Sequence, residues 1–301
     1  MIRSAFNKKM CMSYNTHMQI KKALITAAGL GTRFLPITKT LEKEMLPVYN
    51  KPVIDYLIDD CIHGGITEFV IVVNHRSTQI QDYYTQNPGI EAELNRLGKH
   101  AAVKTIERLH QKATITFVVQ QPDQGYGTAV PLKVAKNHLI DEDAFLVLMG
   151  DDFLYNGEKF SEANLMIAHF KEAHAANAAT GLVTCLERPE EDLYKYGIAK
   201  MHTEKGLPYL DALVEKPAPG TAPSNLANIS KYIFTPKVFE LLETQTINSE
   251  SGELYITDTA TALAEISPVT IYTPQSEYLD CGTPQSWFHA NSVVAKHKEL
   301  S

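Results

Sequence analysis

Short apolar runs alternate with amphipathic segments through the first two thirds of the chain. The apolar runs are continuous, which predicts strands that are buried on both faces, at 22–28, 68–73, 114–119, 145–149 and 180–185. Helical spacing predicts helices at 53–61, 78–85, 128–139 and 161–174, and either one helix or a helical hairpin at 91–110. This rhythm predicts an α/β protein with a Rossmann-like, doubly wound, mostly parallel sheet.

The pattern changes after about residue 185. Segments become shorter and prolines recur, at Pro189, Pro208, Pro217, Pro219 and Pro223. We expect a mixed half that continues the first sheet, followed by a C-terminal helix at about 283–300. The predicted organisation is a polar, disordered extension at 1–20 and a single domain at 21–301, whose halves span about 21–185 and 186–285.

Composition narrows the class of protein. The chain has 301 residues, is 44% hydrophobic and carries a net charge of −7. This length supports a large core, and the acidic balance argues against a general nucleic-acid binder. Its four cysteines, at 11, 61, 185 and 281, are far apart, which favours reduced thiols in the cytoplasm over a zinc site or disulfides. No apolar run approaches the roughly 20 residues of a membrane span, and no secretory signal opens the chain.

A glycine-rich stretch, AAGLGTRFLPITKTLEKEMLP, follows the first predicted strand at 27–47. Gly29 and Gly31 allow a tight turn whose N–H groups can face phosphate oxygens. Arg33 and Lys43 add positive charge, so we expect a bound nucleoside triphosphate. The stretch matches neither the Walker A motif nor the Rossmann fingerprint. The two glycines alone fit a simple strand-to-helix turn equally well.

Two adjacent carboxylates follow the apolar strand at 145–149. Asp151 and Asp152 stand at the carboxyl end of that strand, where ligands bind in open α/β sheets. Mg²⁺ needs only one or two carboxylates and takes its other ligands from phosphates and water. The alternative is that both residues simply form a turn or a helix cap.

The stretch at 29–47 resembles the signature of the sugar-1-phosphate nucleotidyltransferases, G-x-G-T-R-x-x-P-x-T-x(3–4)-P-K-x-x-L-P. Its KEMLP string is most similar to bacterial members that use UTP and glucose 1-phosphate. Further strings match in family order over about residues 20–290: Gln120 with GYGTA at 125–129, GDD at 150–152, YGI at 196–198, VEKP at 214–217, PSNLA at 223–227 and YLDCG at 278–282. The resemblance implies the nucleotide-diphospho-sugar transferase (glycosyltransferase-A-like) fold, with a nucleotide-binding first half and a sugar-binding second half.

The resemblance also implies a reaction, UTP + glucose 1-phosphate ⇌ UDP-glucose + pyrophosphate, with Mg²⁺ as cofactor. It assigns catalytic roles to Arg33, Lys43 and Lys216, sugar binding to Gly197, Glu215 and Lys216, and Mg²⁺ binding to Asp151 and Asp280. It assigns nucleotide binding to Ala28, Gly29, Gly31, Thr32, Gln120, Gly125 and Asp151. It gives Asp152 an indirect or structural role and the GELYITD segment at 252–258 a structural or subunit-contact role, in a homodimer or homotetramer.

Three positions depart from the family pattern. Glu42 replaces a proline before Lys43, where it could offset the lysine's charge or, as we favour, point to solvent. Tyr126 and Thr128 replace leucine and histidine of the bacterial uridylyltransferases. Two alternatives therefore stay open: the same chemistry with another substrate, such as dTTP or another hexose 1-phosphate, and a non-catalytic paralogue that binds nucleotide sugars. The intact charged residues argue against the paralogue.

Overall fold

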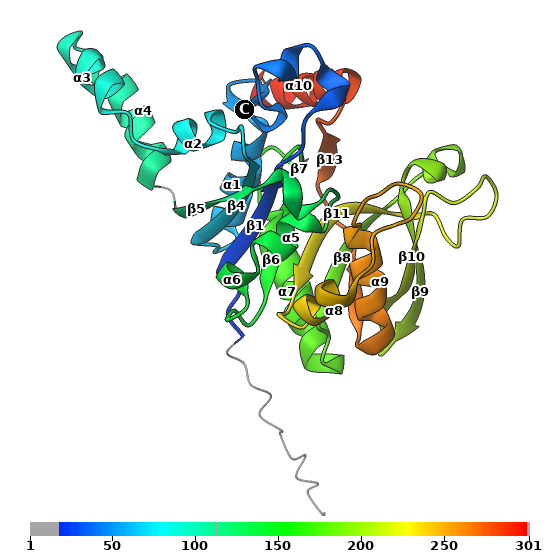
Figure 1. The fold of residues 1–301 in the computed structure, drawn as a ribbon. Helices are drawn as coiled ribbons and strands as arrows, with labels where there is room; N and C mark the ends of the chain where they lie inside the picture. The colour runs from blue at the N-terminus through cyan, green and yellow to red at the C-terminus, as the bar shows by residue number, and fades with distance from the viewer. Residues whose placement is uncertain (1–17, 112, 300–301) are drawn as a thin grey trace, which may run out of the picture.

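A mixed nine-stranded sheet forms the centre of the molecule (Figure 1). The computed structural model describes residues 18–111 and 113–299. The strand order is β5-β4-β1-β6-β11-β8-β12-β10-β9, and β11 and β10 run against the other strands. The strands are β1 (Lys22–Ala27), β4 (Glu68–Asn74), β5 (Thr114–Gln120), β6 (Phe145–Met149), β8 (Gly181–Glu187), β9 (Gly197–Glu204), β10 (Leu207–Glu215), β11 (Leu226–Phe234) and β12 (Val269–Tyr272). The predicted fold class is confirmed: the first half supplies the parallel part, and the second half makes the sheet mixed.

Helices cover both faces of this sheet (Figure 1). They are α1 (Val53–His63), α5 (Val130–Val134), α6 (Lys136–Leu139), α7 (Glu162–Asn177), α8 (Val238–Thr244) and α9 (Ile256–Ile266). Alternate residues of β1 divide between the layers: Ala23 and Ile25 pack with α1 and α7, whereas Leu24 packs with the layer of α5, α6, α8 and α9. The continuous apolar strands are therefore buried on both faces, as the sequence predicts.

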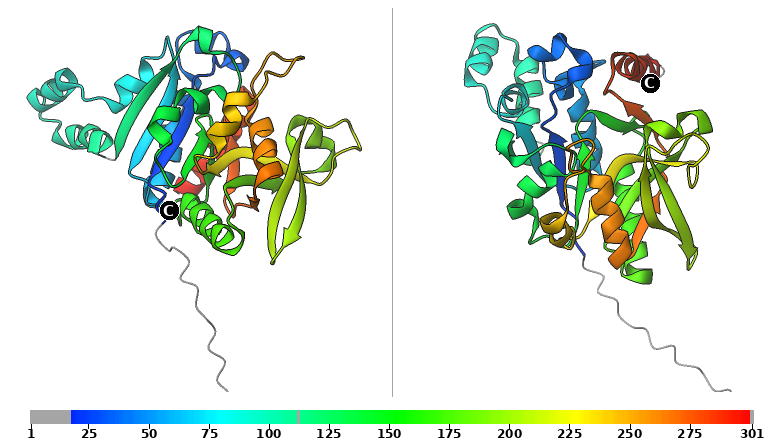
Figure 2. Two further views of the ribbon diagram at one scale, coloured as in Figure 1. Left: turned by 60° about the horizontal axis from the view of Figure 1, so that its bottom comes forward. Right: turned by 45° about the vertical axis from the view of Figure 1, so that its right-hand side comes forward.

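The segment at 91–110 forms a helical hairpin, which was one of its two predicted forms. Its helices are α3 (Pro88–Arg96) and α4 (His100–Gln111), and Gly98, at φ 69°, lies in the turn between them. The hairpin projects beyond the β5 edge of the sheet, away from β9 and β10 at the other edge (Figure 2). The short α2 (Gln79–Tyr84) precedes it. The single helix predicted at 128–139 is wrong, because the chain breaks at Ala135 into α5 and α6.

Two small strand pairs complete the architecture. β7 (Asp152–Tyr155) pairs antiparallel with β13 (Glu277–Asp280), and β2 (Pro47–Val48) pairs with β3 (Lys51–Pro52). The helix predicted at the C-terminus is α10 (Pro284–Glu299), which lies over the β2–β3 segment (Figure 1). Among the described helices, none combines the length and apolar character needed to cross a membrane. Residues 1–17 of the predicted N-terminal extension lie outside the described part; Ile20, just before β1, is buried.

Candidate active site

The glycine-rich loop leaves the carboxyl end of β1 and folds back on itself. It carries Ala28, Gly29, Gly31, Thr32 and Arg33, and the short 3-10 helix at Thr32–Phe34 begins in it. Gly31 has φ 62°, and a Cβ there would lie 2.8 Å from Thr38 Cγ2, so both the conformation and the space require glycine. The Thr38 hydroxyl donates to the Gly31 carbonyl at 2.7 Å. Residues 29–43 of this loop and residues 74–79 together line a hollow.

Lys43 lies at the centre of the charged groups. Its Nζ is 2.6 Å from Asp151 Oδ2 and would be 3.2 Å from a Cβ on Gly29. Burial alone would raise the pKa of Asp151, but the charges of Lys43 and Arg33 lower it below its ordinary value. The structure therefore brings Gly29, Lys43 and Asp151 together, although Lys43 and Asp151 are far apart in the sequence.

Gly282 marks the point where the remaining charged groups meet. A Cβ on this glycine would lie 3.0 Å from Asp280 Oδ1, 3.1 Å from an Arg33 guanidinium nitrogen and 3.4 Å from Asp151 Oδ2. The Gly282 N–H donates to Asp280 Oδ1 at 2.8 Å, and the Cys281 N–H donates to the Asp151 carbonyl at 2.9 Å. Glycine at 282 thus leaves room for two carboxylates and one guanidinium to face the same small space.

This arrangement fits a magnesium ion. In the described part of the chain, no three His, Cys, Asp or Glu side chains gather as a metal-binding group. Two converging carboxylates are nevertheless sufficient for Mg²⁺ when substrate phosphates and water supply the other ligands. Asp151 and Asp280 are the residues that could hold it.

Asp152 points away from these groups into the core. It is buried, forms an ion pair with the equally buried Lys231 of β11 and accepts a hydrogen bond from the Tyr278 hydroxyl at 3.0 Å. Burial raises the pKa of Asp152 to about 6, although Lys231 opposes the shift. Asp152 therefore joins β7, β11 and β13 directly beneath Asp151. Sequence analysis missed Lys231, for which the available signal was a lone lysine in an apolar strand.

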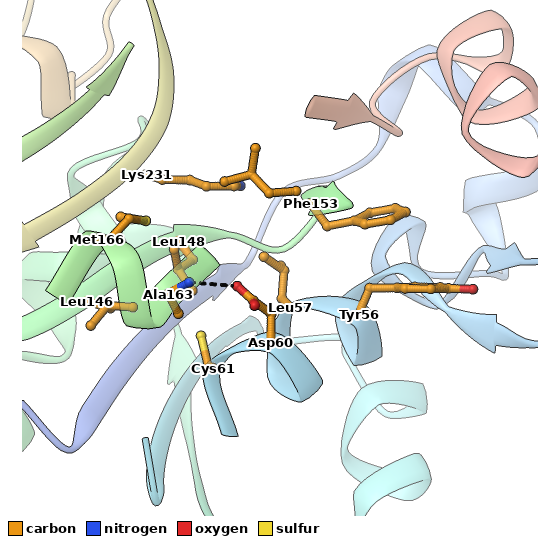
Figure 3. A pocket seen from close by; sticks show the side chains of 11 residues that line it. Tyr56, Leu57, Asp60, Cys61, Leu146, Leu148, Phe153, Ala163, Met166 and Lys231 are labelled. Carbon is orange, nitrogen blue, oxygen red and sulfur yellow. Dashed lines mark hydrogen bonds between the residues drawn. The ribbon is translucent and has the colours of Figure 1, made fainter. Parts of the chain in front are cut away.

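A small internal cavity lies beside Lys231 (Figure 3). Tyr56, Asp60 and Cys61 of α1 and Met166 of α7 help to line it. Asp60 accepts hydrogen bonds from the Glu162 and Ala163 N–H groups at the start of α7, at 2.8 and 3.0 Å. Its carboxylate is therefore engaged in capping a helix, and the cavity is part of the core.

Glu42 does not point to solvent, so our favoured orientation is wrong, and among the described residues its carboxylate makes no ion pair with Lys43. Its carboxylate accepts hydrogen bonds from the Ser77 hydroxyl at 2.7 Å and from the Thr78 and Gln79 N–H groups at 2.9 Å. The Glu42 N–H in turn donates to Gln79 Oε1 at 2.9 Å. Since these groups precede or open α2, Glu42 caps that helix and ties the Lys43 loop to it.

Glu44 is a further residue that sequence analysis missed. It is buried, with Oε1 3.8 Å from Lys43 Nζ. Burial raises the pKa of Glu44 to about 7, although Lys43 opposes the shift. A Cβ on Gly150 would lie 2.9 Å from the Glu44 side chain, so this glycine makes room for it.

A second loop, at 120–129, presents an amide beside a glycine. Gln120 Nε2 donates to the Gly125 carbonyl at 3.1 Å, while Gln120 Oε1 is buried and has no hydrogen-bond partner in the described structure. Gly125 has φ 97°, a conformation that favours glycine. The Thr128 hydroxyl accepts from the Ile256 N–H at 3.0 Å, which ties this loop to the GELYITD segment. Thr128 thus has a structural contact, and that segment supports the loop.

The second half supplies a separate polar group. Gly197 of β9 is the register partner of Glu215 of β10, and a Cβ on Gly197 would lie 3.0 Å from Glu215 Oε2. Burial raises the pKa of Glu215, although Lys216 opposes the shift. Lys216 is exposed, with Nζ 3.8 Å from Glu215 Oε1, and its backbone has φ 44°. Left-handed backbone at a lysine is uncommon and concentrates at functional sites.

Comparison with known proteins extends over almost the whole chain. The sequence profile of the nucleotidyl transferase family matches residues 22–297. The UTP–glucose-1-phosphate uridylyltransferase of Bacillus subtilis (strain 168) is 37% identical over 265 residues, which cover 88% of this chain and 87% of that protein. The protein of the same name from Pseudomonas aeruginosa (strain PAO1) is 34% identical over 274 residues, covering 91% and 95% respectively. A crystal structure of UDP-glucose pyrophosphorylase complexed with UDP-glucose has a TM-score of 0.79 at 30% identity, and the match covers 92% of this chain and 99% of that one.

Proposed function

Since the chain belongs to the nucleotidyl transferase family, we propose that it is a UTP–glucose-1-phosphate uridylyltransferase. It forms UDP-glucose and pyrophosphate from UTP and glucose 1-phosphate. The observation that carries this proposal is the convergence of Lys43, Asp151, Asp280 and Arg33 around Gly29 and Gly282. Cations and paired carboxylates in one small space are what the transfer of a nucleotidyl group between phosphates requires.

The reaction is an in-line displacement without a covalent enzyme intermediate. A phosphate oxygen of glucose 1-phosphate attacks the α-phosphorus of UTP, and the bond to pyrophosphate breaks. The attacking phosphate is already an anion, so no general base is needed. The chain's task is to position two anions and to offset their charge. Arg33 and the N–H groups of the 28–32 loop hold the β- and γ-phosphates, and Lys43 stabilises the charge that develops near the α-phosphate.

Asp151 and Asp280 are the proposed ligands of Mg²⁺, which, when bound, neutralises phosphate charge. Asp151 stays ionised because Lys43 and Arg33 lower its pKa. The same carboxylate orients the Lys43 ammonium at 2.6 Å. Removal of divalent cations should therefore abolish turnover without unfolding the protein.

Base and sugar are read by the two other groups. The Gln120 amide lies beside Gly125 and can pair with the edge of uracil, while Gly125 lets the flat base approach the backbone. Glu215 can accept hydrogen bonds from glucose hydroxyls, beside the open backbone at Gly197. Lys216 is placed to bind the phosphate of glucose 1-phosphate.

The test is pyrophosphate release with Mg²⁺ from UTP, dTTP, CTP and ATP, each with a panel of hexose 1-phosphates. We expect UTP with glucose 1-phosphate to be the preferred pair. Preference for another pair would keep the chemistry and overturn the substrate assignment. No release with any pair, from folded protein that still binds UDP-glucose, would favour the non-catalytic alternative.

Lys43→Ala is the decisive variant. It should lower kcat by roughly 10²–10³-fold, the usual cost of losing a group that stabilises transition-state charge. Lys171→Ala, which removes an exposed lysine on α7, is the matched control and should retain wild-type turnover. Circular dichroism of both variants checks the fold. Wild-type turnover in Lys43→Ala would remove Lys43 from the mechanism.

A further inference from the structure

Arg188 is a cation that the proposed mechanism leaves unused. It directly follows β8, and its backbone N–H donates to the Asn225 carbonyl at 2.9 Å. Its guanidinium carbon lies 5.8 Å from the centre of the Tyr196 ring and 5.7 Å from that of the Tyr278 ring. Both distances are within the range of a cation–π contact, so two aromatic rings hold the guanidinium in place.

The two rings belong to the two sides of the proposed site. Tyr196 immediately precedes Gly197, which faces Glu215, and the Tyr196 carbonyl accepts the Lys216 N–H at 3.0 Å. Tyr278 lies two residues before Asp280, and its hydroxyl binds Asp152. Arg188 therefore lies between the sugar-facing residues and the carboxylates around Gly282.

Unlike the three lysines Lys43, Lys216 and Lys231, Arg188 has no acidic partner among the described residues. Lys43 pairs with Asp151, Lys231 pairs with Asp152, and Lys216 lies 3.8 Å from Glu215. Arg188 Nε, in contrast, is buried and makes no hydrogen bond in the described structure. An unsatisfied buried donor is costly and rare in folded proteins, so it requires an explanation.

We propose that Arg188 is a substrate-contacting residue that binds the phosphate of the sugar 1-phosphate. This inference rests on the proposed function and adds a residue to it. The Arg188 guanidinium lies near both tyrosine rings and presents several N–H donors in one plane, the geometry that suits two oxygens of one phosphate. Arg188 as a whole is only half-buried, so its guanidinium can reach that phosphate and offset the charge of the incoming nucleophile before it meets UTP.

Steady-state kinetics with wild type, Arg188→Met and Arg188→Lys test this assignment. Arg188→Met keeps the side-chain bulk but removes the charge and the donors, so KM for glucose 1-phosphate should rise roughly 10- to 100-fold, as for a lost charged hydrogen bond. KM for UTP should change by less than about twofold, because the proposed contact is to the sugar phosphate and not to UTP. Arg188→Lys should recover part of the loss. Lys195→Met, which removes an exposed lysine paired with Asp192, is the control and should leave both KM values unchanged.

A structural role and a substrate-binding role give different results. If Arg188 only packs between the tyrosines, Arg188→Met will lower the unfolding temperature and leave the ratio of the two KM values unchanged, which overturns the proposal. Calorimetric titration with glucose 1-phosphate separates this outcome from failure of the proposed function. If the wild type shows no turnover, the affinity for glucose 1-phosphate still tests the contact between Arg188 and the sugar phosphate. Weaker binding of glucose 1-phosphate by Arg188→Met than by Lys195→Met would support that contact, and equal binding would refute it.

Discussion

Asp151 and Asp152, which follow β6, are neighbours in the sequence but have opposite electrostatic environments. Asp151 faces Lys43 and Arg33, which lower its pKa, whereas burial beside Lys231 raises the pKa of Asp152 to about 6. The sequence string at 150–152 presents the two carboxylates as equals. Their difference follows from the direction in which each side chain leaves the backbone, and Lys231 and Tyr278, which receive Asp152, come from distant segments.

The buried Lys231–Asp152 pair makes a prediction about stability. Lys231→Met should destabilise the protein by about 3–5 kcal/mol, because it leaves the Asp152 carboxylate buried without its counter-charge. The double variant Lys231→Met/Asp152→Asn should recover much of that loss, since neither charge then remains. Urea unfolding of the wild type, both single variants and the double variant gives the coupling energy. If the effects of the two substitutions on the free energy of unfolding are additive, Lys231 and Asp152 do not stabilise each other and the prediction is wrong.

At the scale of elements, the first half of the chain follows its hydrophobic pattern closely. The strands at 22–27, 68–74, 114–120 and 145–149 agree with prediction to within a residue. A short, continuous apolar run is typical of a strand that is buried on both faces, so its position can be predicted well. After residue 185 the sequence predicts only a mixed half. Polar residues such as those of β9 and β10 lie at the exposed edge of the sheet, where the apolar signal weakens.

Glu42 shows an element contact that the sequence could not reveal. Its partners at Ser77–Gln79 lie beyond α1 and β4 in the chain, and only the return of the backbone to the carboxyl ends of the strands brings them together. The first four N–H groups of any helix lack an acceptor within the helix, so in the six-residue α2 most N–H groups depend on acceptors outside it.

Loss of this cap should therefore affect both stability and catalysis. We expect Glu42→Ala to cost about 0.5–2 kcal/mol of stability, as for other lost helix caps. Turnover should fall by roughly tenfold or more, because the residue next to Lys43 loses its anchor. Glu42→Gln keeps an acceptor oxygen and should lie between wild type and Glu42→Ala. Thermal unfolding and pyrophosphate release measure the two effects, with Glu240→Ala on the exposed face of α8 as control. If Glu42→Ala retains full turnover, the cap has no part in positioning Lys43.

At the scale of the whole molecule, the candidate site exists only in the folded chain. The loop after β1, the turn after β6 and the end of β13 each bring one charged residue to Gly282, and Lys43 lies beside Gly29. Hydrophobic patterning places the first two at the same edge of the sheet, because parallel strands end together. It could not place Asp280, since β13 pairs with β7 outside the main sheet; only the family resemblance linked Asp280 to Asp151.

The C-terminal helix, α10, also lies beside this site. Asn291 of α10 accepts the Tyr49 N–H at 2.9 Å, and Trp287 Nε1 donates to the Pro47 carbonyl at 3.0 Å. Pro47 and Tyr49 lie only a few residues after Lys43. The segment that carries Lys43 is therefore held at both ends. Glu42 anchors its start to α2, and α10 holds its end at Pro47 and Tyr49.

Asn291→Ala should loosen this contact. The Tyr49 N–H is exposed and can bond to water once it loses its acceptor, so we expect a loss of only about 0.5–1.5 kcal/mol, with Lys43 still present but less firmly held. Trp287 is the chain's single tryptophan, so its fluorescence reports directly on this contact. In Asn291→Ala the emission should shift to the red at a lower urea concentration than the loss of far-ultraviolet circular dichroism. Ser292→Ala is the matched control, because within the described residues the Ser292 hydroxyl donates to the Phe288 carbonyl of the same helix and to no other element. Coincident transitions at the wild-type midpoint in Asn291→Ala would mean that α10 is held by its apolar contacts alone.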